Sequence, residues 1–312
     1  MPVTSNTLES DIPTPPANRA HVILGVAAGV ATACIGSTWQ ILSRHSVTTT
    51  IAPLDLALLR YLVPALVLLP LTVRIGLFPQ GVARLRLALM VVCGGLPFLL
   101  LVLTGARLAP VAHLGVMLSG AMPLFTAALA VLVLAQRVSF TRAAGLLLIL
   151  CGVVTLGAGS LATQGAQTWL GDVLFLLASL VWAIYGLAFR SSGLTSWEAV
   201  AVVSAWSAII VVPLAFATGF GSLPSAPVAD LLTQVIVQGV LAGLLGTVLY
   251  NYSIKQLGAQ AATSFSALTP VLSALGGAAF LAERLSFTGI VAVTLASLGV
   301  LLASGIAFPR RA

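Results

Sequence analysis

Ten long apolar stretches constrain the fold of this chain more than any other feature. An α-helix rises 1.5 Å per residue, so about 20 apolar residues cross about 30 Å of hydrocarbon. The stretches lie at 22–43, 54–75, 87–107, 111–134, 142–161, 169–190, 197–218, 230–254, 259–281 and 288–308. They are continuously apolar, and lipid offers no partner to exposed backbone polar groups, so they predict helices rather than a barrel. We expect an all-α integral membrane protein with ten transmembrane helices.

The composition supports this class and excludes others. The chain is 59% hydrophobic and 7% charged, whereas soluble domains carry about 25% charged residues. The net charge of +7 does not indicate nucleic-acid binding, because Lys255 is the only lysine and no dense basic cluster exists. Cys34, Cys93 and Cys151 each lie inside an apolar stretch, where cysteine acts as a small hydrophobic residue.

One stretch of the sequence occurs twice, at a constant offset of 147 positions. In each copy a serine precedes a proline by four residues, and an arginine in a polar turn follows. The matched pairs are Ser119 and Ser266, Pro123 and Pro270, and Arg137 and Arg284. A fixed offset near half the chain length indicates two similar halves. Each half contains five stretches, an odd number, so the halves must insert in opposite directions. We therefore expect a five-plus-five inverted repeat, which is typical of secondary transporters.

The repeat sets the expected domain organisation and orientation. The first five-helix repeat covers 22–161 and the second covers 168–308, with a disordered cytoplasmic tail at 1–21 and a cytoplasmic tail at 309–312. With the N-terminus inside, only Arg44, Arg107 and Arg284 of the 14 basic residues fall at outside ends, and Arg60 lies within a helix. Cytoplasmic segments are enriched in basic residues. This predicts a multi-pass protein of a bacterial-type inner (plasma) membrane, with both termini cytoplasmic.

Several chemistries have no motif in this sequence. There is no P-loop, no His-Glu-x-x-His, no Gly-x-Ser-x-Gly and no pair of carboxylates inside a helix, which argues against an ATP-driven pump or a hydrolase. We expect no catalytic residue, no metal site and no cofactor. The carboxylates fall near predicted helix ends, and only His113 is placed to relay protons, so we expect little proton coupling.

The duplicated kinks supply the first candidate binding residues. Proline removes its own donor and crowds the carbonyl four residues back, so Pro123 and Pro270 free a carbonyl beside Ser119 and Ser266 at midplane depth. These groups suit an ammonium or an amide. The alternative is a packing kink in which each serine bonds its own helix. His113 and Met117 share a helix face with Ser119, and Ser264 is the counterpart of Met117; for His113 the alternative is a cap at the helix end.

Aromatic and amide residues supply the other candidates. Trp182 and Tyr185 lie deep in their helix, while Trp39 and Gln40 lie nearer an interface, where an aromatic belt is the alternative. Tyr250 and Asn251 fit a pocket wall, because a buried asparagine needs partners. Arg60 is assigned a structural role, in which it extends toward the outer interface or pairs with a carboxylate such as Asp55 or Asp172.

The pattern resembles the EamA-like drug/metabolite transporter superfamily over residues 22–308. The resemblance rests on the ten helices in two halves, on Arg60-Tyr61 in the second helix, and on the turns after Pro123 and Pro270. The stretch from Pro270 to Ser286 is the most specific; in its twin, Gln136 stands where Glu is usual.

This resemblance implies a secondary transporter with a midplane pocket between helices 1, 3, 4, 6, 8 and 9, as in the YddG-type aromatic amino-acid exporters. We expect a monomer in the lipid bilayer that exports neutral or aromatic amino acids by alternating access without ATP. The alternatives are efflux of another substrate class, such as drugs, and a membrane scaffold or enzyme that transports nothing.

Overall fold

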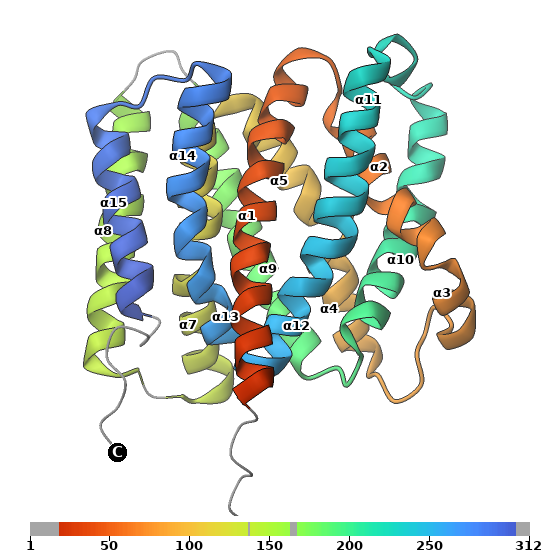
Figure 1. The fold of residues 1–312 in the computed structure, drawn as a ribbon, viewed down its shortest axis with the longest axis horizontal. Helices are drawn as coiled ribbons and strands as arrows, with labels where there is room; N and C mark the ends of the chain where they lie inside the picture. Colours follow the sequence, from red (N-terminus) through yellow and green to blue (C-terminus); the bar gives the residue numbers. More distant parts are fainter. Residues whose placement is uncertain (1–18, 137, 163–166, 304–312) are drawn as a thin grey trace, which may run out of the picture.

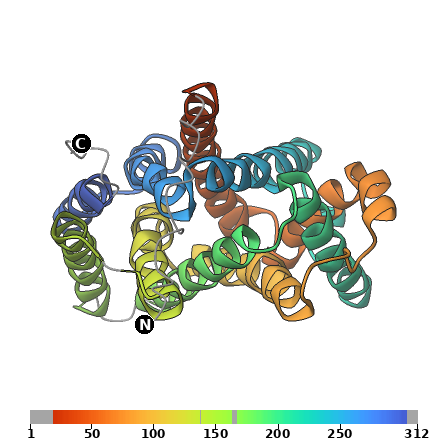
Figure 2. The ribbon, with the colours of Figure 1, turned by 90° about the horizontal axis from the view of Figure 1, so that it is seen from below.

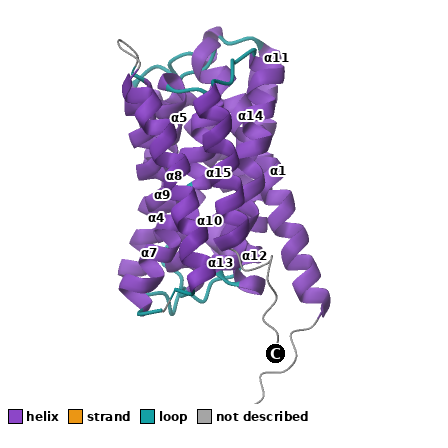
Figure 3. Cartoon of the chain, turned by 90° about the vertical axis from the view of Figure 1, so that its left-hand side faces the viewer, coloured by secondary structure: helices purple, strands orange, loops and turns teal. Residues whose placement is uncertain are grey.

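The computed structural model describes residues 19–136, 138–162 and 167–303, and every regular element within them is helical (Figures 1 and 3). The elements are α1 (Arg19–Thr49), α2 (Pro53–Val67), α3 (Leu69–Ile75), α4 (Arg84–Gly94), α5 (Leu96–Leu108), α6 (Val111–Leu114), η1 (Gly115–Gly120), α7 (Met122–Leu134), α8 (Phe140–Ala162), α9 (Thr168–Arg190), α10 (Ser196–Ala217), η2 (Leu223–Ser225), α11 (Val228–Gln234), η3 (Val235–Gly246), α12 (Thr247–Leu257), α13 (Ala259–Ser264), η4 (Phe265–Ala267), α14 (Leu268–Leu281) and α15 (Phe287–Ala303). Residues 1–18 of the predicted tail at 1–21, the tail at 309–312 and residues 163–166 between the halves lie outside the described residues, and residues 19–21 belong to α1 rather than to a disordered tail.

Eight helical segments of the described chain are long and apolar enough to cross a membrane, and a ninth is the bent pair α2–α3. They correspond to nine of the ten predicted stretches. The tenth, 288–308, contains α15, which has 17 residues; residues 304–308 lie outside the described part of the chain. The predicted all-helical class is therefore confirmed for the described residues, and the count of ten transmembrane helices stays a prediction.

The helices form an elongated bundle with its connections at the two ends (Figures 1 and 3). We call the end where α1 begins, at the bottom of Figure 1, the near end, and the opposite end the far end. Figure 2 shows α8 and α15 together at one side of the bundle, with α2, α3 and α10 at the other. The cavity described below lies between these groups.

Proline accounts for the sharpest bend. α2 and α3 meet at an angle of 69° at Leu68, with Pro64 inside α2 and Pro70 in the first turn of α3. Neither proline has an N–H to continue the helical ladder. The helix also changes type before both repeated prolines: π-helix η1 precedes Pro123, and 3-10 segment η4 precedes Pro270.

The two duplicated stretches end in the same way. α7 is followed by Ala135 and α14 by Ala282, both in the left-handed conformation, with φ of 50° and 53°. In each case the backbone N–H of this residue donates to a carbonyl five residues back, that of Ala130 or Gly277. Non-glycine residues seldom adopt this conformation, and the two alanines are 147 positions apart, the offset of the sequence repeat.

Small residues bring helices into close contact. A Cβ atom on Gly239 would lie 2.6 Å from Cβ of Val63, and one on Gly243 would lie 2.7 Å from the carbonyl oxygen of Arg60. This approach seats α2 directly on η3. Gly25 and Gly29 make the same kind of contact with Leu257 and Phe265.

The outer surface of the bundle is apolar. Large hydrophobic side chains such as Val73, Leu132, Phe140, Leu161 and Phe287 are 70–90% exposed in the isolated chain. A water-soluble monomer rarely exposes so much apolar surface. This surface suits the hydrocarbon of a bilayer, which leaves polar chemistry for the interior of the bundle.

Candidate functional site

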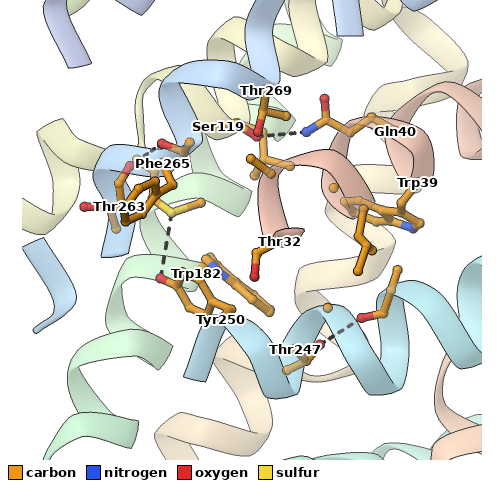
Figure 4. Close-up of a pocket in the computed structure, with 18 of the residues that line it drawn as sticks. Thr32, Trp39, Gln40, Ser119, Trp182, Thr247, Tyr250, Thr263, Phe265 and Thr269 are labelled. Atoms are coloured by element: carbon orange, nitrogen blue, oxygen red, sulfur yellow. Dashed lines mark hydrogen bonds between the residues drawn. The ribbon is translucent and has the colours of Figure 1, made fainter. Parts of the chain in front are cut away.

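A central cavity lies among the helices of both halves and holds about 730 Å³ of space not filled by atoms, part of it open to solvent. Figure 4 shows the lining side chains. The lining residues are Gly29, Thr32, Ala33, Ile35, Gly36, Trp39 and Gln40 of α1; Arg60 of α2; Phe98 of α5; Leu118 and Ser119 of η1; Met122 of α7; Trp182 of α9; Ala242 and Gly246 of η3; Thr247 and Tyr250 of α12; and Ala262, Thr263, Phe265, Ser266 and Thr269 from α13 to α14.

Gln40 closes the cavity toward the far end. Its amide Nε2 donates to Ser119 Oγ at 2.8 Å, and its Oε1 accepts from Ser273 Oγ at 2.7 Å. The amide thus joins α1 to η1 of the first half and to α14 of the second; Figure 4 shows the bond to Ser119. A buried amide held on both sides has a fixed orientation.

An aromatic wall faces the cavity from α9 and α12. The Trp182 ring lies 4.5 Å from Phe98 and 5.5 Å from Tyr250, centroid to centroid. Tyr185 packs behind Trp182 at 4.9 Å, and its hydroxyl and the Asn251 amide are hydrogen-bonded at 2.8–3.0 Å. Tyr185 and Asn251 do not line the cavity. They form a supporting layer that fixes the wall.

Trp39 and Arg60 form the opposite polar corner. Trp39 Nε1 donates to Gln238 Oε1 at 2.8 Å, and Gln238 Nε2 donates to Ser43 Oγ at 2.8 Å. The Arg60 guanidinium lies over the Trp39 ring, 4.8 Å from its centroid. Trp39 is 6% exposed, so it does not belong to an interfacial belt.

Neither form of the structural role predicted for Arg60 is found. Arg60 is only 6% exposed and lines the cavity, so it does not reach an interface. Asp55 accepts hydrogen bonds from the backbone N–H and hydroxyl of Ser222, and Asp172 is bonded to His113 and Ser160. Neither carboxylate pairs with Arg60.

Several hydroxyls in the wall are bonded to their own helices. Thr32 donates to Ala28 O at 2.7 Å, Thr247 to Ala242 O at 3.0 Å, and Ser266 to Thr263 O at 2.5 Å. Ser266 thus follows the alternative in which a kink serine bonds its own helix, while Ser119 accepts from Gln40. The two duplicated serines line the same cavity with different hydrogen bonds.

The remaining predicted residues lie elsewhere. His113 is bonded through Nδ1 to Asp172 Oδ1 at 2.8 Å, near the far end of the bundle. Met117 is 1% exposed, and its side chain is directed toward Gly157 of α8. Pro123 and Pro270 shape the chain without lining the cavity. Ser264 is the last residue of α13, and its side chain lies outside what the structure describes.

A polar network crosses the far end, one helical turn beyond Gln40. Arg44 Nε pairs with Glu283 Oε1 at 3.0 Å, and its Nη1 donates to Ala106 O at 2.5 Å. Glu283 Oε2 accepts from the Val111 N–H at 2.8 Å. This network, which we call the far-end clamp, ties α1 to the end of α14 and to the α5–α6 connection.

A smaller cavity at the near end is lined by Gln136 of the first duplicated turn and by Arg190 of α9. Gln136 is 147 positions before Glu283, and Arg190 is 146 positions after Arg44. The counterparts of the two clamp residues therefore line one cavity at the opposite end of the bundle, with a neutral amide in place of the carboxylate.

Sequence reasoning did not single out Thr32, Phe98, Thr247, Thr263, Phe265 or Thr269 as lining residues. Threonine is common in apolar helices because it can bond its own backbone. The available signal is that these threonines are among the few polar residues in their stretches. The sequence contains no means of telling which of them face inward.

Comparison with known proteins identifies the family. The model of the EamA-like transporter family matches this chain twice, at residues 23–158 and again at 169–305. The chain belongs to the EamA-like transporter family. The two matches cover most of the sequence, and each coincides with one of the predicted halves.

Two relatives of this EamA-like protein show how far the similarity extends. An uncharacterized transporter of Bacillus subtilis (strain 168), YyaM, is 27% identical over 199 residues, which is 62% of this chain and 64% of that protein. The chain thus spans less than two thirds of the length of the curated relative it matches. A solved crystal structure with 18% identity superposes with a TM-score of 0.63 over 91% of this chain and 98% of the other, which shows the fold.

Proposed function

We propose that this EamA-like protein is a secondary transporter that exports neutral amino acids, with aromatic or other large side chains accepted, without using ATP. The observation that carries the proposal is the central cavity, where an aromatic wall faces polar groups inside an apolar bundle. The aromatic surface suits a bulky side chain, since apolar burial contributes about 25 cal/mol per Å². Amides, hydroxyls and carbonyls suit the polar end of an amino acid.

Alternating access is proposed from the two ends of the bundle. The far-end clamp and Gln40 tie both halves together beyond the cavity. At the near end, Gln136 and Arg190 occupy the corresponding place around a small cavity. In the proposed inverted repeat, one end closes while the other opens, and the arrangement described here is closed at the far end.

We propose that the near end is cytoplasmic, as the basic residues of the sequence indicate. Gln80, between α3 and α4, and Ser225, between α10 and α11, are exposed at opposite ends. Each is replaced by cysteine in a chain whose Cys34, Cys93 and Cys151 are changed to alanine. A membrane-impermeant maleimide added to intact cells should label Ser225→Cys at once and Gln80→Cys only after permeabilisation. The reverse order would overturn the orientation.

Transport is tested by flux from proteoliposomes loaded with labelled phenylalanine, methionine or glycine. We expect flux of phenylalanine and methionine to exceed that of glycine and to persist when an ionophore collapses any pH gradient. Trp182→Ala should reduce flux of the two large substrates by about tenfold or more, because it removes the central ring of the wall.

Trp169→Ala is the matched control, because Trp169 lies on the same helix and is 45% exposed on the outer surface. It should transport like the unchanged protein. If Trp182→Ala is folded and equally active, the aromatic wall does not bind substrate. If none of the three solutes moves in any liposome, the amino-acid proposal is overturned, which leaves efflux of another substrate class or a scaffold or enzyme that transports nothing.

A further inference from the structure

The buried guanidinium of Arg60 has no counter-charge among the residues that the structure describes, and its surroundings define a ligand. Arg60 is 6% exposed, and its Nη1 is buried with no hydrogen-bond partner among the described residues. A charged group is taken out of water at high cost unless it is paired and hydrogen-bonded. The arginine therefore needs an anion that the described part of the protein does not supply.

Four of the five carboxylates that the structure describes are engaged elsewhere, and the fifth, Asp230, lies in the first turn of α11 and does not line the cavity. Glu283 pairs with Arg44, and Asp172 with His113. Asp55 accepts from Ser222, and Glu198 accepts from the Thr195 N–H in a capping box at the start of α10. No salt bridge to Arg60 occurs among the described residues.

The position of Arg60 leaves its edge for a ligand. Trp39 covers one face of the guanidinium, and a cation over an aromatic face leaves its in-plane donors unused. A planar fork of N–H groups matches a carboxylate better than any other small anionic group except phosphate. Arg60 and Trp39 lie at one corner of the cavity that the aromatic wall also lines. Figure 4 shows Trp39 apart from Trp182 and Tyr250, with Thr32 between them.

We propose that Arg60 binds the carboxylate of the transported solute, which restricts substrates to molecules with a single carboxylate and an apolar or aromatic remainder. This assignment rests on the proposed transport function. It makes Arg60, rather than helix dipoles or an amide, the group that binds the carboxylate. A second anionic group finds no second cation among the lining residues. The site thus selects monocarboxylates, of which neutral amino acids are one kind.

Calorimetric binding to the purified full-length protein tests the assignment with three probes. These are phenylalanine, its amide, which lacks the carboxylate, and hydrocinnamate, which lacks the ammonium. The unchanged protein should bind phenylalanine at least about tenfold more tightly than the amide, since an unpaired buried charge costs at least that factor. Arg60→Gln should lose this ratio, and Arg60→Lys, which keeps the charge without the fork, should retain part of it.

The ratio of the affinities for the acid and the amide separates binding from folding. If Arg60 had only a structural role, its substitution would weaken the binding of both ligands equally. Thermal unfolding of each variant reports whether it is folded. Equal binding of phenylalanine and its amide by the unchanged protein would overturn the Arg60 assignment and leave amino-acid transport standing. Hydrocinnamate binding that depends on Arg60, without phenylalanine binding, would sustain the assignment and overturn the amino-acid proposal. If folded Arg60→Gln still binds phenylalanine more tightly than its amide by the same ratio, the Arg60 assignment is also overturned.

Discussion

Gly299→Ala is expected to unfold this protein at a much lower temperature, although alanine adds only one methyl group. α8 and α15 pack against each other more extensively than any other two elements. A Cβ atom on Gly299 would lie 2.6 Å from the Gly145 carbonyl oxygen and 2.7 Å from the Ile149 nitrogen. Both are backbone atoms, which cannot rotate away as a side chain can. We expect a loss of about 3 kcal/mol or more, at the upper end of overpacking costs.

Thermal unfolding in detergent, followed by size-exclusion chromatography, measures this effect. Gly157→Ala is the matched control on α8, because its Cβ would meet only Met117 Cε, at 3.8 Å. That is an ordinary contact, so this variant should unfold within a few degrees of the unchanged protein. Equal melting temperatures for the two variants would show that the close contact of α8 with α15 does not exist in the membrane protein.

Glu283→Gln is expected to open the far end of the bundle. The substitution turns one of two acceptor oxygens into a donor, while the Arg44 guanidinium and the Val111 N–H both donate to this side chain. Hydrogen bonds to charged groups contribute about 1.5–3 kcal/mol. In the proposed cycle, their loss should shift the balance between the closed and open far end by about ten- to a hundredfold.

Accessibility of the cavity measures the shift. Thr32→Cys places a thiol in the cavity wall (Figure 4), in a chain whose three native cysteines are replaced by alanine. An impermeant methanethiosulfonate added from the far side should modify it faster in Glu283→Gln. Glu198→Gln is the control, because it makes the same chemical change in a capping box at the other end.

The near end allows the reciprocal experiment. Gln136→Glu places a carboxylate in the cavity that Arg190 also lines, and it should slow modification of Thr32→Cys from the near side. Unchanged rates in both Glu283→Gln and Gln136→Glu would mean that these residues do not control access to the cavity.

The helices were predictable because a bilayer leaves few alternatives. Each apolar stretch corresponds to helical structure in the described residues, and the repeated prolines mark places where the helix changes type. The bend between α2 and α3 was not predicted, since Pro64 and Pro70 lie in a stretch that reads as one apolar segment. A count of spans from hydropathy does not reveal where a helix breaks.

The candidate site was predictable only in part, for a related reason. In a helix of a soluble protein, the polar face marks the exposed side and the apolar face marks the buried side. A membrane helix that is apolar all round gives no such pattern. Trp182 and Tyr185 are three residues apart and both buried, yet one lines the cavity and the other supports it. Arg60 lines the cavity where α2 packs on η3 at Gly243, and this contact joins residues far apart in the sequence.

The hydrogen bonds of the cavity-wall hydroxyls affect the free energy of the transporter after it has released its solute. Thr32 and Thr247 donate to carbonyls of their own helices, and Gln40 is held by two serines. These groups keep their partners when the site is vacant, so departure of the solute leaves no penalty of unsatisfied donors there. In the proposed alternating-access cycle, the two threonines keep their hydrogen bonds when the solute has left, whereas the charge of Arg60 is then left unpaired.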